Sequence, residues 1–233
     1  MYPLDAAALA HHRAIIALDI ERSTSRDDMA KAELRGRIYE FLDAALRAAG
    51  IEPVHRDEFF DLGDGILTLI HPVQEAPKLL LVTHVIPYLN DLLIDYNAGV
   101  SCGRKSDYQL RVRVVVHGGE VHYDAHGCFG EALDIAFRLL NAVQVKKTFR
   151  SAPGPLVVVA SDDFYWSVIR HGGDQPDRRA FQSLVRVRVA DRSHNGWVQL
   201  PDVTSRKSSS EVNGDPLPWA SPDTALHLLS QSA

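Results

Sequence analysis

The fold of this chain is most constrained by an unbroken apolar run close to its first residues. Residues 13–20 read RAIIALDI, so branched apolar side chains occupy successive positions and a carboxylate lies near the end. Such a run is typical of a strand that is buried on both faces of a sheet. Asp19 is therefore an acid at the end of a buried strand, where an unpaired carboxylate would be costly.

The residues after this strand carry the signals of a turn and a long helix. The polar stretch ERSTSRDD is rich in helix N-cap residues, and apolar residues then recur every four positions until Gly50. The pattern predicts a helix over 28–49. The main-chain N–H groups near Ser23 and Thr24 would begin that helix and bind phosphate oxygens, although Ser and Thr are also the usual N-caps.

The rest of the chain alternates between strand and helix patterns. Strands are expected at 52–60, 66–70, 110–117, 155–161, 183–190 and 196–201. Helices are expected at 77–95 with a kink at Pro87, at 129–142, and in a short segment after residue 161. Tight turns are expected at residues 62–65, around Asp64, and at Gly118–Gly119. The mixture predicts an α+β fold, in which helices cover one sheet.

Composition and charge exclude several classes of partner. The net charge is -5, and Lys and Arg do not gather on one predicted element, so we expect no nucleic-acid and no membrane partner. No apolar run approaches the roughly 20 residues that span a bilayer, and MYPLDAAALAHHRA lacks the features of a signal peptide. Cys102 and Cys128 are too few for a disulfide framework, so a cytoplasmic location is expected. Residues 203–233 have no periodicity and are expected to form a disordered tail.

Asp19 and Asp64 are the acids that could do chemistry. If the first strand and the second, expected at 52–60, are neighbours, both carboxylates converge at one edge of the sheet. Two adjacent carboxylates repel unless a cation lies between them, and oxygen ligands suit Mg²⁺ or Mn²⁺. The alternative is that Asp19 caps the following helix and Asp64 is only a turn residue.

Arg138 and Asp134 lie four residues apart in the predicted helix at 129–142, so they share one face. This spacing alone favours a surface ion pair worth about 0.5 kcal/mol or less. Alternatively, Arg138 would meet the negative charge that develops on a reacting phosphate. The eleven histidines show no metal-binding spacing and are interpreted as structural or surface residues.

Three segments occur in the order found in class III adenylate and guanylate cyclases. ALDIERSTS resembles the first metal motif of that family, and DLGDGILTLIH resembles the hairpin that carries the second metal Asp. LRVRVVVHGGEVHYDAHGCFGEALDIAFRLL resembles the strand, hairpin and helix that end in an Asn-x-Ala-x-Arg pattern. The resemblance covers residues 12–145 well and the strands to residue 201 loosely. It implies a ferredoxin-like cyclase domain over residues 1–202, with a mixed, mostly antiparallel sheet.

The resemblance also implies how the site residues divide their work. Asp19, Asp64 and the main-chain carbonyl of Ile20 would bind two Mg²⁺ or Mn²⁺ ions, one helping to deprotonate the ribose 3′-hydroxyl and one holding the triphosphate. Arg138 would stabilise the transition state, and Asp134 would take the place of the ribose-orienting Asn. Active sites of this family form between two subunits, so a homodimer acting on a nucleoside triphosphate is expected.

The chain departs from the family pattern where adenine is read. Phe60 stands where cyclases that use ATP carry a Lys, and Gly127 stands where they carry an Asp or Thr. The base pocket therefore resembles that of the bacterial pyrimidine cyclases of antiphage defence, which make cyclic UMP or cyclic CMP. We expect UTP or CTP as the substrate; the alternative is a catalytically inactive, cyclase-like nucleotide sensor or interaction module. For the family's triphosphate-binding Lys, Arg186 and Arg188 are the candidates.

Overall fold

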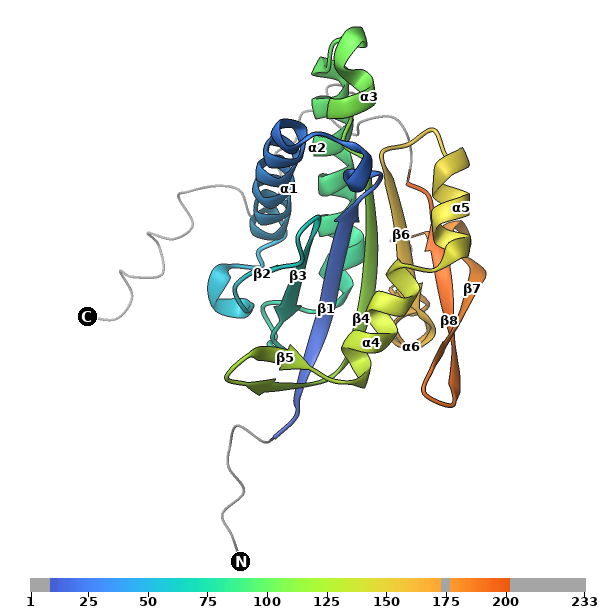
Figure 1. Cartoon of the computed structure of the whole chain (residues 1–233). Coiled ribbons are helices and arrows are strands. Elements are labelled where there is room, and N and C mark those ends of the chain that lie inside the picture. Colours follow the sequence, from blue (N-terminus) through green and yellow to red (C-terminus); the bar gives the residue numbers. More distant parts are fainter. Residues whose placement is uncertain (1–8, 173–176, 202–233) are drawn as a thin grey trace, which may run out of the picture.

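The computed structural model describes residues 9–172 and 177–201, and the apolar run forms a central strand of its sheet. This strand, β1 (His11–Ile20), is antiparallel to β3 (Gly65–Ile70) on one side and to β4 (Val112–Asp124) on the other. β1 lies between these neighbours in Figure 1. The prediction of a buried strand at 13–20 is confirmed.

The sheet has eight strands in the order β2-β3-β1-β4-β6-β8-β7, with β5 paired to β4. β4 and β6 run parallel, and the other pairs in this order are antiparallel. The remaining strands are β2 (Phe60–Asp61), β5 (Gly127–Phe129), β6 (Leu156–Ser161), β7 (Gln182–Val189) and β8 (Arg192–Gln199). The prediction of an α+β fold with a mixed, mostly antiparallel sheet is confirmed.

Helices cover both faces of the sheet (Figure 1). One face carries α1 (Asp28–Ala48) and α2 (Ile86–Gly99), and the other carries α4 (Glu131–Leu140) and α5 (Val143–Ser151). Because side chains alternate along a strand, residues 16 and 18 of β1 pack toward the first pair, and residues 15 and 17 pack toward the second. Asp19 follows the second set, so its strand position places it on the face of α4 and α5.

The start of α1 differs from the prediction. Asp27 is the N-cap, because its carboxylate accepts a hydrogen bond from the Ala30 N–H at 2.8 Å. Ser23–Ser25 form a separate 3₁₀ turn before it, preceded by Arg22 at a φ of 60°. Ser23 and Thr24 therefore do not begin α1, and Asp19 does not cap it.

Two strand predictions were wrong in part. Of the segment 52–60, only its last residue pairs within β2, because Pro53 begins a 3₁₀ turn and Pro has no N–H to donate to a sheet. Gly118 and Gly119 do not turn the chain; β4 runs straight through them. A Cβ at Gly119 would lie 2.6 Å from Cβ of Ala132, so the glycine lets α4 approach the sheet.

The turn that ends β4 lies six residues further on, at Asp124–Gly127. The Asp124 carboxylate accepts hydrogen bonds from the N–H groups of His126 and Gly127, at 2.7 and 3.1 Å. This side-chain acceptor stabilises the turn locally. The long strand places β5 and the start of α4 on the same side of the sheet as Asp19.

The helical segments also differ in detail. The helix predicted at 77–95 contains a π-helical turn, Leu81–Val85, and continues as α2, so Pro87 falls in the first turn of α2. The segment 143–151 was not predicted as a helix but forms α5. The expected short helix after residue 161 is α6 (Asp162–Phe164), continued by the π-helical turn Tyr165–Ile169.

A short helix, α3 (Lys105–Tyr108), precedes β4. The tail expected at 203–233 lies outside the described residues. Within residues 9–172 and 177–201, no helix is long and apolar enough to cross a membrane.

Candidate functional site

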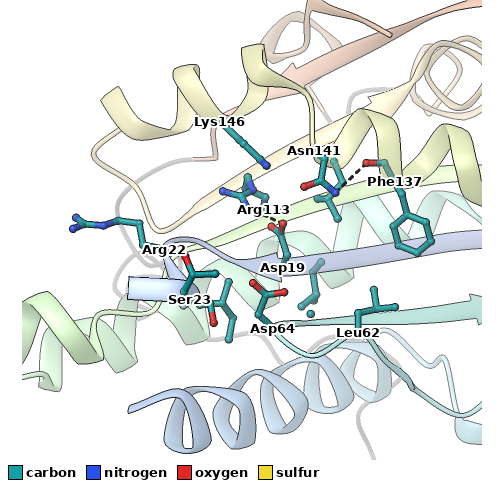
Figure 2. Close-up of a pocket in the computed structure, with 14 residues that line it drawn as sticks. Asp19, Arg22, Ser23, Leu62, Asp64, Arg113, Phe137, Asn141 and Lys146 are labelled. Atoms are coloured by element: carbon teal, nitrogen blue, oxygen red, sulfur yellow. Dashed lines mark hydrogen bonds and ion pairs between the residues drawn. The ribbon is translucent and has the colours of Figure 1, made fainter. Parts of the chain in front are cut away.

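A cavity of about 500 Å³ opens at the end of β1, within the range of roughly 300–1,000 Å³ typical of small-molecule sites. Figure 2 shows side chains from several elements pointing into it. They come from the end of β1 and the turn after it, the turn before β3, β4, and the junction of α4 and α5. The lining consists of Leu18, Asp19, Ile20, Arg22, Ser23, Thr24, Leu62, Asp64, Gly65, Arg113, Phe137, Leu140, Asn141 and Lys146.

The structure brings Asp19 and Asp64 together in this cavity. Asp19 pairs with Gly65 in the register of β1 and β3, and the Ile20 N–H donates to the main-chain oxygen of Asp64 at 2.9 Å. In Figure 2 the two carboxylates lie beside each other. The two acids thus meet at the end of β1, but not by the expected route. The strand beside β1 is β3, whereas β2 pairs with β3 and not with β1.

Gly65 permits this close approach. A Cβ at Gly65 would lie 2.3 Å from the main-chain oxygen of Leu18, which no side chain can occupy without moving the strands. Gly63 takes the positive φ, 85°, in the turn between β2 and β3. Both glycines therefore fix the backbone that carries Asp64.

The Asp19 carboxylate is largely buried. Its Oδ2 accepts a hydrogen bond from Arg113 Nη2 at 2.7 Å, and the two side chains are only 13% and 11% exposed. Burial raises the pKa of Asp19, Arg113 opposes that rise, and the neighbouring Asp64 adds to it. Asp19 Oδ1 is buried and has no hydrogen-bond partner among the residues that the structure describes. A buried, unpaired carboxylate oxygen is costly unless something binds it.

These residues fit a cation with oxygen ligands. The Asp19 Oδ1 atom lacks a partner, and Asp64 and Ile20 contribute further oxygens to the same cavity. Among the described residues, no group of three or more His, Cys, Asp and Glu is placed to hold a metal. An ion here would therefore share two carboxylates with oxygens from a bound ligand, the arrangement in which Mg²⁺ is often found.

Three cations that line the cavity, Arg22, Arg113 and Lys146, were not predicted as site residues from the sequence. Arg113 lies opposite Asp19 in the register of β1 and β4. Its position could have been predicted from the sequence if the pairing of these two strands had been known. Lys146 belongs to α5, which was not predicted. Arg186 and Arg188, the triphosphate candidates, instead lie on β7 at the far edge of the sheet. Neither lines the cavity, and Arg186 donates to the Ser193 hydroxyl at 3.3 Å.

The other predicted site residues divide into two groups. Ser23 and Thr24 line the cavity, but Phe60 and Gly127 do not. Asp134 and Arg138 lie on the exposed side of α4, away from the cavity, and no ion pair joins them within the described part of the chain. The interpretation of this pair as a surface ion pair is therefore wrong.

A second, open hollow lies beside α4. Asp134 lines it together with Phe137, and the remaining lining comes from β5, the start of α4 and the end of β7. Phe137 also lines the cavity at Asp19, so the two hollows share this side chain. Of the two residues predicted for catalysis on α4, Asp134 therefore lines this second hollow, and Arg138 lines neither.

This architecture is shared with solved nucleotide cyclase structures. An adenylate/guanylate cyclase/hydrolase from Silicibacter pomeroyi aligns with a TM-score of 0.57 at 17% identity, over 84% of this chain and 99% of that one. A bacterial light-regulated adenylyl cyclase aligns with a TM-score of 0.55 at 12% identity, over 81% and 90%. The catalytic core of a rhodopsin-guanylyl cyclase with converted specificity, in complex with ATPαS, gives 0.51 at 14%, over 82% and 96%.

No protein-family model matches the chain, and no curated protein matches its sequence. The likeness therefore lies in the three-dimensional structure, and at these identities it establishes the fold. The expectation of a cyclase-type α+β domain is confirmed at that level.

Proposed function

We propose that this protein is a nucleotidyl cyclase that converts a nucleoside triphosphate into a 3′,5′-cyclic nucleotide and pyrophosphate. The observation that carries the proposal is the pairing of Asp19 with Asp64 in one cavity of a cyclase-type fold, with a buried oxygen of Asp19 left without a partner. A domain of this fold can also serve other functions, so the proposal depends on the residues of the site and not on the fold alone.

The residues of the cavity suit the chemistry of this reaction. Asp19, Asp64 and the carbonyl of Ile20 would hold Mg²⁺ or Mn²⁺ ions, which when bound lower the pKa of the ribose hydroxyl and neutralise phosphate charge. Ser23 and Thr24 offer hydroxyl and main-chain N–H donors at the rim of the same cavity. Arg113 supplies a fixed positive charge beside Asp19.

The rest of the catalytic group would come from a second copy of the chain. Arg138 lies on the exposed side of α4 and does not line the cavity of its own chain, so it is free to reach a site on another molecule. We infer a homodimer in which Asp134 and Arg138 of one protomer face Asp19 and Asp64 of the other. Arg138 would then stabilise charge at the reacting phosphate, and Asp134 would accept a hydrogen bond from the ribose.

The base would be a pyrimidine, and the product cyclic UMP or cyclic CMP in antiphage signalling. Phe60 and Gly127 offer a base no side-chain hydrogen bond, so the usual means of reading adenine is missing. Phe60 does not line the cavity of its own chain, but it is half-buried and packs against the core. At the proposed dimer interface its ring would stack on a base without ordering a flexible side chain. A pocket narrowed by Phe60 would then favour a pyrimidine over a purine, because the pyrimidine ring is smaller.

Purified protein incubated with Mn²⁺ or Mg²⁺ and each of the four nucleoside triphosphates tests the proposal. Mass spectrometry should detect cyclic UMP or cyclic CMP, and equal-concentration competition should favour the pyrimidine over ATP. Efficient formation of cyclic AMP or cyclic GMP would contradict the base assignment alone. Absence of every cyclic product, with the protein folded, would contradict the enzyme.

One observation favours the alternative, a cyclase-like nucleotide sensor without catalysis. The ion pair between Arg113 and Asp19 occupies one oxygen of the carboxylate that a metal would need. Asp134 would add negative charge near the triphosphate. A sensor would bind nucleoside triphosphate in a calorimetric titration while releasing no pyrophosphate, whereas the cyclase releases one pyrophosphate for each cyclic nucleotide.

A further inference from the structure

Lys146 is a cavity residue that was not predicted from the sequence. It lies on α5, whose buried residues Val145 and Phe149 pack the helix against the sheet. The next position, Lys146, is half-buried and lines the cavity that holds Asp19. In Figure 2 its side chain points toward Arg113 and Asp19. Packing of α5 therefore fixes where this ammonium group can reach.

Three cations line the cavity, and they differ in what they contact. Arg22 is exposed, and its side chain points away from Asp19 in Figure 2. Arg113 is committed to Asp19 by a hydrogen bond of 2.7 Å. Lys146 forms no ion pair or hydrogen bond with any part of the chain that the structure describes. The Lys146 ammonium group is only half-buried, and its charge acts on Asp19 across the cavity. It is therefore open to an anionic ligand that enters the cavity, which would gain a charge-assisted contact.

The arginines expected to do this work do not lie near the cavity of their own chain. β7, which carries Arg186 and Arg188, is separated from β1 by β4, β6 and β8. Lys146, by contrast, belongs to the same cavity as both carboxylates. One cation and both acids thus come from the same protomer.

We propose that Lys146 binds the terminal phosphates of the triphosphate, from the same protomer as Asp19 and Asp64. This inference rests on the proposed function. In the reaction, the ribose 3′-oxygen bonds to the α-phosphorus, the bond from that phosphorus to the β-phosphate oxygen breaks, and the hydroxyl proton leaves to solvent. The electron pair of the broken bond goes to pyrophosphate. Lys146 would hold that leaving group and offset the charge it gains.

The test compares Lys146→Met with Lys147→Met in the full-length protein. Lys147 is the matched control, because it is the next residue of α5, is exposed and does not line the cavity. Calorimetry at fixed ionic strength with Mn²⁺ would measure the dissociation constants of inorganic tripolyphosphate and of uridine. Lys146→Met should raise the tripolyphosphate constant about tenfold or more, while leaving uridine binding unchanged. Lys147→Met should stay within about twofold of wild type.

Lys146→Arg keeps the charge and should recover most of the binding, and circular dichroism would show that each variant is folded. Equal tripolyphosphate binding by Lys146→Met and Lys147→Met overturns the inference, whether both are unchanged or both weakened. If wild type makes cyclic nucleotide in that case, the proposed function survives without this residue. If wild type neither binds tripolyphosphate nor makes a cyclic product, both proposals fail.

Discussion

At the scale of single residues, Asp19 carries a negative charge where little solvent reaches it. Arg113 satisfies one carboxylate oxygen, but within the described residues the other has no partner. Burial and the nearby Asp64 both raise the pKa of Asp19. Removing the Asp64 carboxylate would therefore lower the pKa of Asp19, and it would also remove a ligand for a cation.

Asp64→Asn should weaken Mn²⁺ binding at least about tenfold and reduce turnover about a hundredfold or more, because a neutral amide is a poorer ligand than a carboxylate. Electron paramagnetic resonance of free Mn²⁺ would measure the binding. Asp191→Asn, at the exposed turn between β7 and β8, is the control and should change neither quantity. Unchanged Mn²⁺ binding in Asp64→Asn would contradict the metal site.

His117 makes stability depend on pH away from the cavity. It is 2% exposed, and its Nδ1 lies 2.6 Å from the Ser161 hydroxyl. Burial lowers the pKa of His117 from 6.5 to about 4, with Asp163 opposing and His194, Lys78 and His12 adding to the fall. The folded pKa lies below the unfolded one, so the stabilisation is present above pH 6.5 and is lost as the pH falls toward 4.

Between pH 7.5 and 4, wild type should therefore lose about 3 kcal/mol more free energy of unfolding than His117→Gln does. Urea denaturation at several pH values measures both slopes. Because the comparison uses the change with pH, a uniformly less stable variant still gives an answer. Identical slopes in the two proteins would show that His117 is protonated with similar ease in the folded and unfolded states.

At the scale of elements, glycines decide how closely β1, β3 and α4 approach. Gly65 leaves room for the main chain of β1, and Gly119 leaves room for Ala132 of α4. Gly36 is different, since nothing lies within 4 Å of a Cβ built on it and it sits on the exposed side of α1. The same substitution should thus act in opposite directions.

Gly65→Ala should destabilise the protein by about 2 kcal/mol or more and displace Asp64, because a backbone carbonyl cannot move away from the new methyl group cheaply. Gly36→Ala should stabilise it by about 0.5–1 kcal/mol, since alanine loses less entropy than glycine in a helix. Chemical denaturation measures both changes. A harmless Gly65→Ala would mean that β1 and β3 are further apart than described.

At the scale of the whole molecule, each protomer holds only part of the proposed catalytic group. The cavity has the acids, and the exposed side of α4 has Arg138. A symmetric dimer that brings these surfaces together would form two equivalent sites. In the proposed dimer, activity would therefore depend on both chains.

Mixing Asp19→Ala with Arg138→Ala protein should restore about one quarter of wild-type activity, because half of the randomly mixed dimers contain one intact site out of two. Cyclic nucleotide is measured after subunit exchange, and native mass spectrometry, which resolves the different masses of the two variants, confirms that mixed dimers form. Each variant alone serves as the control and should be inactive. No recovery in proven mixed dimers would contradict a site shared between protomers.

The sequence predicted the elements whose signals are local. The apolar run at 13–20, the periodic helix at 28–49 and the terminal hairpin all exist, because alternation and helical repeats report burial directly. Resemblance in three segments also predicted the cyclase-type fold. The predictions for 52–60 and for Gly118–Gly119 were wrong. Pro53 begins a turn where a strand was expected, and Gly119 makes room for α4 instead of turning the chain.

What only the tertiary structure decided is which side chains meet. Asp19, Asp64 and Arg113 are far apart in sequence and become neighbours through the registers of β1 with β3 and β4. Lys146 joins them because α5 packs on the same face of the sheet. The periodicity of a sequence records whether a residue is buried but not what it faces, since pairing and packing partners are set by contacts between distant segments.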